Sequence, residues 1–223
     1  MRGMPFFTEN VAKHGVQLHN YYTNTPICCP SRATTLSGRY FHNQRMPTAL
    51  KGGCMHADIK SLDAQGLPSW NNFTVQRHFA EAGWTTGMFG KHHHMKGERM
   101  CMQANKTTGG TLWTPPGWDE FFAYCHIGYY QAQWVHNGLW FATGAAPTDY
   151  ATSRIGNATS AWIKKWAAAS KKATDPDEVK PFFAYLAPHA PHAPSTPAPW
   201  YLSDPAVQAR FNNSFPPRTP NCE

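Results

Sequence analysis

The sequence predicts an α/β fold in which helices flank a mainly parallel central sheet. Strand-like and helical segments alternate along the chain, and this alternation is typical of crossover connections between parallel strands. Hydrophobic residues make up 41% of the 223 residues and aromatic residues 14%, so the chain can bury a core without disulfide cross-links. This length corresponds to one medium domain or two small ones.

The first half of the chain predicts its elements through apolar spacing and helix stops. In chain order they are a short helix at 4–14, a strand at 16–22, a helix opening near Ser31, a helix at 73–82 and a short buried strand at 84–90. Phe7 and Val11 are spaced i, i+4, so they share one face of the first helix. Gly15 and Gly83 stand where the helices before them should stop.

The second half predicts a loop-rich region, one long helix and one more buried strand. Residues 107–147 are rich in Gly, Pro and Trp, which favours loops. Residues 148–170 predict a long helix, because several of them fall on one apolar stripe: Ile155, Thr159, Trp162, Ile163 and Trp166. The run FFAYLA at 182–187 predicts a buried strand, and the chain after it is Pro-rich.

Chemically active side chains stand where the predicted strands end. Cys28 follows the first strand, residues 91–94 follow the second, and His189 and His192 follow the third. In open α/β sheets, ligands bind at the carboxyl ends of the strands. We therefore expect these segments at the ligand-binding edge of the sheet.

The charge balance argues against a nucleic-acid partner. Lys and Arg number 20 and Asp and Glu number 13, so the formal charge of +7 reflects few acids rather than many bases. The longest basic runs are pairs such as Lys164–Lys165, whereas nucleic-acid binders cluster their basic residues.

The sequence contains no apolar stretch of the ~20 residues that a membrane span needs, and its first residues do not form a signal peptide.

Two further features bear on the cellular compartment. Acceptor triplets for N-glycosylation, N-x-S/T, occur at Asn72, Asn105, Asn157 and Asn212, and they suit a glycosylated secretory protein, although such triplets also arise by chance. The six cysteines are too few and too irregularly spaced for a disulfide scaffold. Cys28 and Cys29 are adjacent, so at least one of them needs another explanation.

The segment ICCPSRATTLSGR at 27–39 has the properties of an anion site. Ser31 can cap a helix, whose N-terminus offers free N–H groups and the positive end of the dipole. Arg32 and Arg39 add cations suited to a tetrahedral oxyanion, and a cysteine here could be a nucleophile of low pKa. The alternative interpretation is a capped helix with two buried thiols.

The same segment resembles the signature of the type I sulfatases. That family pattern is C-x-P-S-R-x-x-x-L-T/S-G-R, and every fixed position matches from Cys28 to Arg39. The resemblance implies an alkaline-phosphatase-like (sulfatase) fold and an enzyme that hydrolyses sulfate esters. It also implies that a formylglycine-generating enzyme oxidises Cys28 to formylglycine in the secretory pathway, for an extracellular or lysosomal protein. Cys29 is then the variable position, and Arg32 holds the modified side chain.

The second cluster is Lys91 followed by three consecutive histidines, 92–94. Consecutive side chains point in different directions, so they seldom bind one metal ion together. Sulfatases carry G-K-x-H after a strand, where the lysine contacts sulfate and the histidine contacts the modified residue. The resemblance therefore implies roles for Lys91 and His93, while the glucosamine-6-sulfatase branch favours His94 as the polar partner.

The third cluster is the Pro- and His-rich run at 181–194. A histidine among prolines is most often a plain loop residue. The run also resembles the family pattern P-F-F-x-Y-x-A-x-x-x-x-H-x-P, which implies that His192 stands near the leaving oxygen. A histidine titrates near neutral pH, so it can protonate a leaving alkoxide. His189 is the weaker candidate for this role.

Further stretches resemble the N-acetylglucosamine-6-sulfatase and plant or algal arylsulfatase branch. They are PPGWDEFF at 115–122 and RTPN at 218–221. The aromatic rings of the first stretch either line a sugar or aryl pocket or pack in the core. The implied substrates are sulfated carbohydrates, such as 6-sulfated glycosaminoglycan units, or aryl sulfates.

The family resemblance also implies a divalent cation, usually calcium, that the formylglycine from Cys28 contacts. Its other ligands come from an Asp-Asp pair and an Asp-Asn pair, and neither pair occurs in this sequence. Asp58, Asp119 and Asp149 are isolated. We therefore interpret 1–223 as a partial sulfatase catalytic domain without its N-terminal Asp-Asp strand and C-terminal portion, which puts activity of this chain alone in doubt.

The sequence leaves two other function classes open. One is a catalytically inactive sulfatase-like fragment or paralogue that binds sulfated glycans through Arg32, Lys91 and the aromatic loops. The other is a related phosphatase or phosphodiesterase, although those enzymes normally use Thr or Ser as the nucleophile.

Overall fold

The fold is built on a five-stranded mixed sheet in the order β4-β3-β2-β1-β5. The computed structural model describes residues 4–44, 73–92, 112, 114–175, 178–206 and 209. The strands are β1 (Thr85–Gly90), β2 (Glu120–His126), β3 (Gln133–His136), β4 (Leu139–Ala142) and β5 (Phe182–Ala187). The α-helices are α1 (Pro5–Asn10), α2 (Cys28–Ser37), α4 (Val75–Glu81), α6 (Ala151–Ser170) and α7 (Pro199–Ser203). Short 3-10 helices are η1 (Ala12–His14), η2 (Phe41–Gln44) and η5 (Pro147–Asp149).

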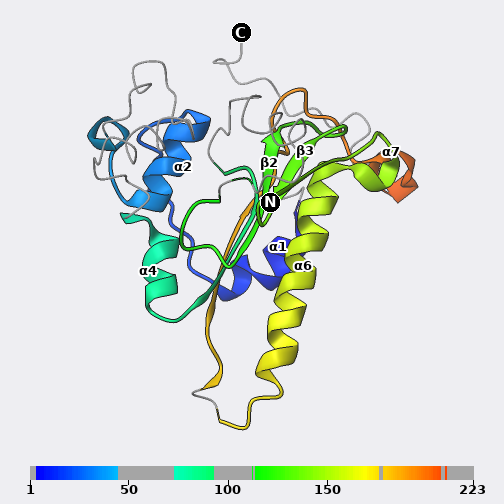
Figure 1. Cartoon of the computed structure of the whole chain (residues 1–223). Coiled ribbons are helices and arrows are strands. Elements are labelled where there is room, and N and C mark those ends of the chain that lie inside the picture. The colour runs from blue at the N-terminus through cyan, green and yellow to red at the C-terminus, as the bar shows by residue number, and fades with distance from the viewer. Residues whose placement is uncertain are drawn as a thin grey trace.

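Helices cover both faces of this sheet, which confirms the predicted α/β class. Figure 1 shows α2 and α4 on one side of the strands and α6 along the other. Alternate residues of the strands therefore face different helices. Phe89 and Trp134 pack in a cluster with Ile155 of α6, while Met88 and Val135 belong to a second cluster on the other face.

The central strands are parallel, as expected, but the sheet as a whole is mixed. β1 pairs in parallel with β2 and with β5, whereas β2, β3 and β4 form an antiparallel meander. The prediction that 107–147 is loop-dominated is therefore wrong for β2–β4. Asn137 and Gly138 have φ values of 48° and 87°, which is the backbone of a tight two-residue hairpin turn. The Asn-Gly pair is a strong hairpin signal, but the Gly-, Pro- and Trp-rich composition of the region favours loops, and the hairpin was therefore not predicted.

Other predicted elements can also be compared with the structure. The expected strand at 16–22 is wrong: these residues form no regular element, and Val16 and Tyr22 are 89% and 82% exposed. Alternating apolar residues make a strand only when a neighbouring strand supplies the hydrogen bonds, and the described residues pair none with this segment. Helix α2 begins at Cys28, three residues before the predicted start. The predicted elements at 73–82, 84–90, 148–170 and 182–187 are confirmed, with their ends shifted by up to three residues.

The two described aspartates that the sequence left isolated have structural contacts. Asp119 Oδ2 accepts hydrogen bonds from the backbone N–H and the hydroxyl of Thr86, at 2.8 and 3.2 Å. Asp149 accepts a hydrogen bond from Arg154 at 2.8 Å and another from the backbone N–H of Ala146 at 3.3 Å. Asp58 lies outside the described residues.

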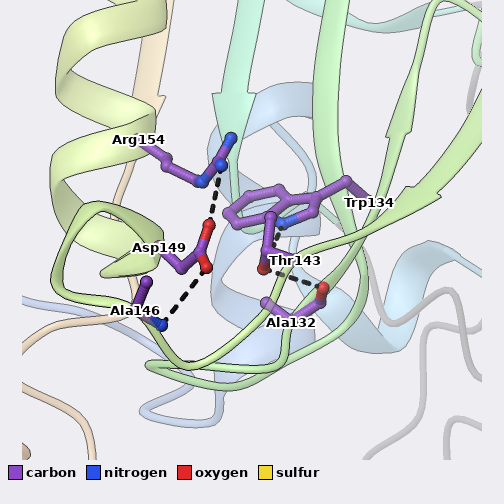
Figure 2. A network of polar contacts seen from close by, with 6 residues as sticks. All are labelled: Ala132, Trp134, Thr143, Ala146, Asp149 and Arg154. Atoms are coloured by element: carbon purple, nitrogen blue, oxygen red, sulfur yellow. Dashed lines mark hydrogen bonds and ion pairs between the residues drawn. The ribbon is translucent and has the colours of Figure 1, made fainter.

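The Asp149 contacts belong to a polar network that anchors the β2–β3 loop, residues 127–132. Figure 2 shows Thr143 between Trp134 and Ala132, with Asp149 reaching both Ala146 and Arg154. Trp134 Nε1 donates to the Thr143 hydroxyl, which in turn donates to the Ala132 carbonyl at 3.1 Å. The segment before α6 therefore holds the β2–β3 loop in place, and this loop borders the site described below.

Replacing Asp149 with Asn is expected to lower stability at neutral pH and to leave it unchanged in acid. The hydrogen bond from Arg154, with that from Ala146, lowers the pKa of Asp149 below its ordinary value. A lowered folded-state pKa adds stability above the unfolded carboxyl pKa, and this stability is lost as pH falls through the folded value. The effect should be small beside that of a core substitution, because the ion pair is partly open to water. Thermal midpoints of both proteins between about pH 7 and about pH 3 should converge at the acid end, and a constant difference would contradict the assignment.

Candidate active site

A cavity of about 550 Å³ opens where the parallel strands end. Lys91 follows β1, Ile127 follows β2 and His189 follows β5, and all three line this cavity. Its wall is completed by Cys28, Gly128, Tyr129, Tyr130, His192, Ala193, Pro194 and Thr196. The predicted position at the carboxyl ends of the strands is thus the position of this cavity.

Cys28 is the first residue of α2 and the free cysteine of the described part of the chain. Its neighbour Cys29 is disulfide-bonded and completely buried beside Ala33 and Leu36. Cys125 is disulfide-bonded as well. The adjacent cysteines therefore have different fates, so the interpretation as two buried thiols does not hold. Cys28 keeps a thiol that faces the cavity.

Two cationic side chains form hydrogen bonds with the Cys28 side chain: Arg32 and Lys91. Arg32 lies one helical turn after Cys28 on the same face of α2, and its Nε donates to the backbone carbonyl of His92. Arg32 Nη2 is buried and has no hydrogen-bond partner among the described residues. Burial lowers the pKa of Arg32, an effect that Tyr185 and Cys28 partly oppose. A buried guanidinium with an open N–H favours an anion close to Cys28.

Lys91 is held by the junction of β1 and β5. Its backbone N–H donates to the carbonyl of Ala187 at 2.7 Å, and the residue is 8% exposed. Burial, and then the charge of Arg32, lower the pKa of Lys91. The residue before it, Gly90, has a φ of +107° and leaves no room for a side chain, because a Cβ there would stand 2.2 Å from the Ala187 oxygen. Glycine at position 90 thus lets the strands stay paired up to Lys91.

His192 reaches the cavity from the loop that follows β5. Its side chain is exposed, and its Nδ1 lies 2.8 Å from the carbonyl oxygen of Ala193. Because a carbonyl only accepts, Nδ1 carries the hydrogen and Nε2 is left for proton exchange. The ring of His189 lies 4.7 Å from that of His192, at an interplanar angle of 27°. Unlike His192, His189 is buried, with 7% of it exposed.

The cavity brings together part of the predicted set of site residues. Cys28, Lys91 and His192 line it, and Arg32 contacts Cys28 from α2. His93 and His94 lie outside the described residues, so the choice between them stays a prediction. Among the predicted glycosylation sites, Asn157 is exposed on α6, while Asn72, Asn105 and Asn212 lie outside the described residues.

The aromatic lining of the cavity comes from outside the stretch 115–122, for which the sequence leaves both pocket lining and core packing open. In the stretch 115–122, Phe121 is 1% exposed and Trp118 packs against two core clusters, so these two side chains pack in the core. The cavity is instead lined by Tyr129 and Tyr130 of the β2–β3 loop. Sequence reasoning missed both tyrosines because it did not predict β2, the strand that delivers them to the edge of the sheet.

The comparisons with known proteins agree with this arrangement. The family model described as Sulfatase matches residues 1–223, and the chain therefore belongs to the sulfatase family. The chain is 29% identical over 192 residues to the extracellular sulfatase SULF-1 homolog of Drosophila melanogaster, with 83% of this chain and 15% of that protein covered. It is 28% identical over 217 residues to N-acetylglucosamine-6-sulfatase of Homo sapiens, with 95% and 34% covered. An arylsulfatase of Volvox carteri is 28% identical over 192 residues, with 84% and 25% covered.

Solved structures share the fold over most of the chain. One is a complex of a protein with its substrate, D-glucosamine-2-N,6-O-disulfate; it has a TM-score of 0.58 at 21% identity and covers 96% of this chain. This chain covers 34% of that structure. The chain thus spans about one third or less of the length of each of these relatives. None of the helices in the described ranges is long and apolar enough to cross a membrane.

Proposed function

We propose that this chain forms part of an enzyme that hydrolyses sulfate esters, with Cys28 as the precursor of its nucleophile. The observation that carries the proposal is the cavity that joins the first residue of the sulfatase signature, Cys28, to Lys91 and His192. These residues come from three separate parts of the sequence. Membership of the sulfatase family supports this reaction class for the protein as a whole.

Cys28 fits the formylglycine that the family signature implies. It is free, half-buried and open to the cavity, and it begins a helix. A hydrated formylglycine would supply one hydroxyl that attacks sulfur and a second whose oxygen re-forms the aldehyde as sulfate leaves, which a thiol cannot do. The proposal includes a formylglycine-generating enzyme as the partner that modifies Cys28.

Arg32 and Lys91 neutralise the sulfate in this proposal. Both hydrogen-bond to the Cys28 side chain, so both lie next to the reacting centre. Burial makes their charges act through a medium of lower dielectric constant than water, which strengthens their attraction to a sulfate oxygen. Bound sulfate in turn favours the charged forms of both side chains, and this offsets the burial that lowers the pKa of each.

His192 gives a proton to the leaving oxygen in this proposal. Its Nδ1 is engaged with the Ala193 carbonyl, so Nε2 is the atom that carries the transferred proton. Sugar alkoxides are poor leaving groups, and protonation by a positioned histidine typically accelerates such a step by about 10²–10⁴-fold. His93 or His94 would contact the modified Cys28 or the substrate.

The calcium ion that the family resemblance implies does not fit the described residues. In the ranges that the structure describes, no three His, Cys, Asp or Glu side chains stand together where they could hold a metal ion. Asp119 and Asp149 are engaged in structural hydrogen bonds. Calcium binding at Cys28 stays a prediction from the family, with its remaining ligands expected outside this chain.

The proposed substrate class is a sulfated carbohydrate, with aryl sulfates as the simpler analogues. The relatives include an N-acetylglucosamine-6-sulfatase and an arylsulfatase, and one structural neighbour was solved with a sulfated glucosamine. Tyr130 on the cavity wall is partly exposed, and its flat apolar ring can stack on a sugar ring.

We also propose that the protein passes through the secretory pathway and acts outside the cell or in lysosomes. The disulfide bonds of Cys29 and Cys125 require an oxidising compartment. Asn157 is exposed and available to carry a glycan. Its glycosylated peptide in protein secreted from eukaryotic cells, together with oxidised Cys29, would check the route; a reduced Cys29 in that preparation would contradict it.

The proposed function predicts release of inorganic sulfate by the full-length protein from glucosamine 6-sulfate or an aryl sulfate. The matched substrates are the corresponding phosphate esters, which an enzyme with a Thr or Ser nucleophile would prefer. Sulfate release well above phosphate release is the expected result. Preferential release of phosphate, or tight binding of a sulfated glycan without hydrolysis, would overturn the proposal.

A further inference from the structure

Three aromatic rings contact one another in a row on the wall of the cavity: the ring of His192 stacks on that of His189, and the ring of Tyr129 packs against His189 at an interplanar angle of 52°. His189 is the middle ring, 4.9 Å from Tyr129 on one side and 4.7 Å from His192 on the other. Tyr124 of β2 meets the edge of His189 at 6.2 Å. The exposed ring of His192 thus stacks on the ring of His189, which is buried against Tyr124 of the sheet.

We propose that His189 and Tyr129 are positioning residues that hold the imidazole of His192 for proton transfer to the leaving oxygen. This inference rests on the proposed function of His192. The sequence does not point to Tyr129. It gives His189 only as the weaker candidate for the role of His192, not as a residue that positions His192.

Two tyrosine hydroxyls donate hydrogen bonds to the loop that carries His192. Tyr129 Oη donates to the backbone carbonyl of His192 at 2.7 Å, and Tyr150 Oη donates to the carbonyl of Thr196 at 2.8 Å. The two tyrosine rings also stack on each other, with centroids 5.8 Å apart. Within the loop, the N–H of His192 donates to the carbonyl of His189 at 3.0 Å. Tyr129 therefore fixes the backbone of His192, while His189 supports its ring.

His189 can support a charged His192 without taking its proton. The groups that face His189 are Lys91 after β1, Tyr124 of β2, Tyr129 of the β2–β3 loop and His192 itself, with Cys28 of α2 in the same cavity. No described carboxylate lines that cavity.

Burial, then the charges of Lys91 and His192, lower the pKa of His189 to about 4. His189 is therefore neutral at neutral pH. The face of a neutral aromatic ring attracts a cation.

The proton balance of the step involves His192 alone. The Nε2–H bond of charged His192 breaks as an O–H bond forms on the leaving alkoxide, which departs as an alcohol. His192 returns to its neutral form and takes up a proton from water before the next turnover. His189 neither gains nor loses a proton in this cycle.

The test compares two substrates in the full-length protein: a sugar sulfate, whose leaving group needs protonation, and a nitrophenyl sulfate, whose leaving group does not. The variants Tyr129→Phe and His189→Ala should lower kcat for the sugar sulfate about tenfold, with KM nearly unchanged and nitrophenyl sulfate turnover nearly unaffected. His189→Phe restores a neutral ring and should recover most of the loss. Tyr22→Phe, whose side chain is exposed outside the cavity, should change neither substrate.

A second readout is independent of turnover. In a Cys28→Ala background, which cannot be modified, NMR titration of the His192 ring should show a shifted and broadened transition once His189 becomes Ala. An unaltered His192 titration, or an equal loss with both substrates, would overturn the proposal. The variant His192→Ala distinguishes a failure of this proposal from a failure of the proposed function. If the His192→Ala protein hydrolyses both substrates normally, His192 has no role in proton transfer, and the positioning role of His189 is lost with it.

Discussion

Replacing Cys28 with Ala is expected to reduce sulfate release to the background rate while the protein stays folded. Cys28 is half-buried at the first position of α2, where alanine is compatible with a helix. The side chain that attacks sulfur is lost, and removal of a nucleophile costs at least about a thousandfold in kcat. Release of sulfate from a sugar sulfate, with the thermal midpoint measured in parallel, checks both statements.

The matched control for this variant is Thr35→Ala on the same helix. Thr35 is exposed and its hydroxyl donates only to the Ser31 carbonyl one turn earlier, so activity should be unchanged. Substantial sulfate release by the Cys28→Ala protein would contradict the assignment of Cys28. A loss that merely follows unfolding would appear as a lowered thermal midpoint.

Replacing Gly90 with Ala is expected to destabilise the protein by about 3 kcal/mol or more and to abolish activity. The new Cβ would stand 2.2 Å from the Ala187 oxygen and 3.1 Å from Cδ1 of Ile155, at a φ of +107°. Either β1 separates from β5 or the chain fails to fold. In both cases Lys91 loses the backbone hydrogen bond to Ala187 that holds it beside Cys28. Urea unfolding and sulfate release measure the two effects.

Gly156→Ala is the control for the glycine substitution. Gly156 lies within α6, and a Cβ there would meet no atom within 4 Å. Alanine in a helix is favoured over glycine by about 0.5–1 kcal/mol, so this variant should be slightly more stable than the parent. A Gly90→Ala protein as stable and active as Gly156→Ala would show that position 90 does not control the site.

The parts of the site that the sequence predicts are those with a local signal. The signature from Cys28 to Arg39 is continuous, so Cys28 and Arg32 could be named without any knowledge of the fold. Lys91 and His192 each follow a short apolar strand, and this position alone places them at the edge of the sheet.

The rest of the site depends on contacts between distant segments. His189 is buried because Tyr124 and Tyr129, more than 50 residues earlier, pack against it. A sequence shows that a histidine lies among prolines, but not which rings will cover it. The different fates of Cys28 and Cys29 likewise depend on which partner each side chain reaches in the folded chain.

Two errors in the predicted fold have different causes. The strand expected at 16–22 rested on alternation alone, which is insufficient when the described residues offer no pairing strand. The hairpin at β3–β4 does have a local signal, the turn dipeptide Asn137–Gly138. The Gly-, Pro- and Trp-rich composition of the region favoured a loop instead, so the hairpin was not predicted.

Mass spectrometry of the Cys28 peptide tests the central claim most directly. The full-length protein is produced in a eukaryotic secretory system, digested without reduction, and the peptide that contains residues 28–32 is analysed. We predict an aldehyde at position 28, trapped by a hydrazide reagent, and a disulfide-bonded Cys29 in the same peptide. An unmodified thiol at Cys28 in a preparation that releases sulfate would contradict the account.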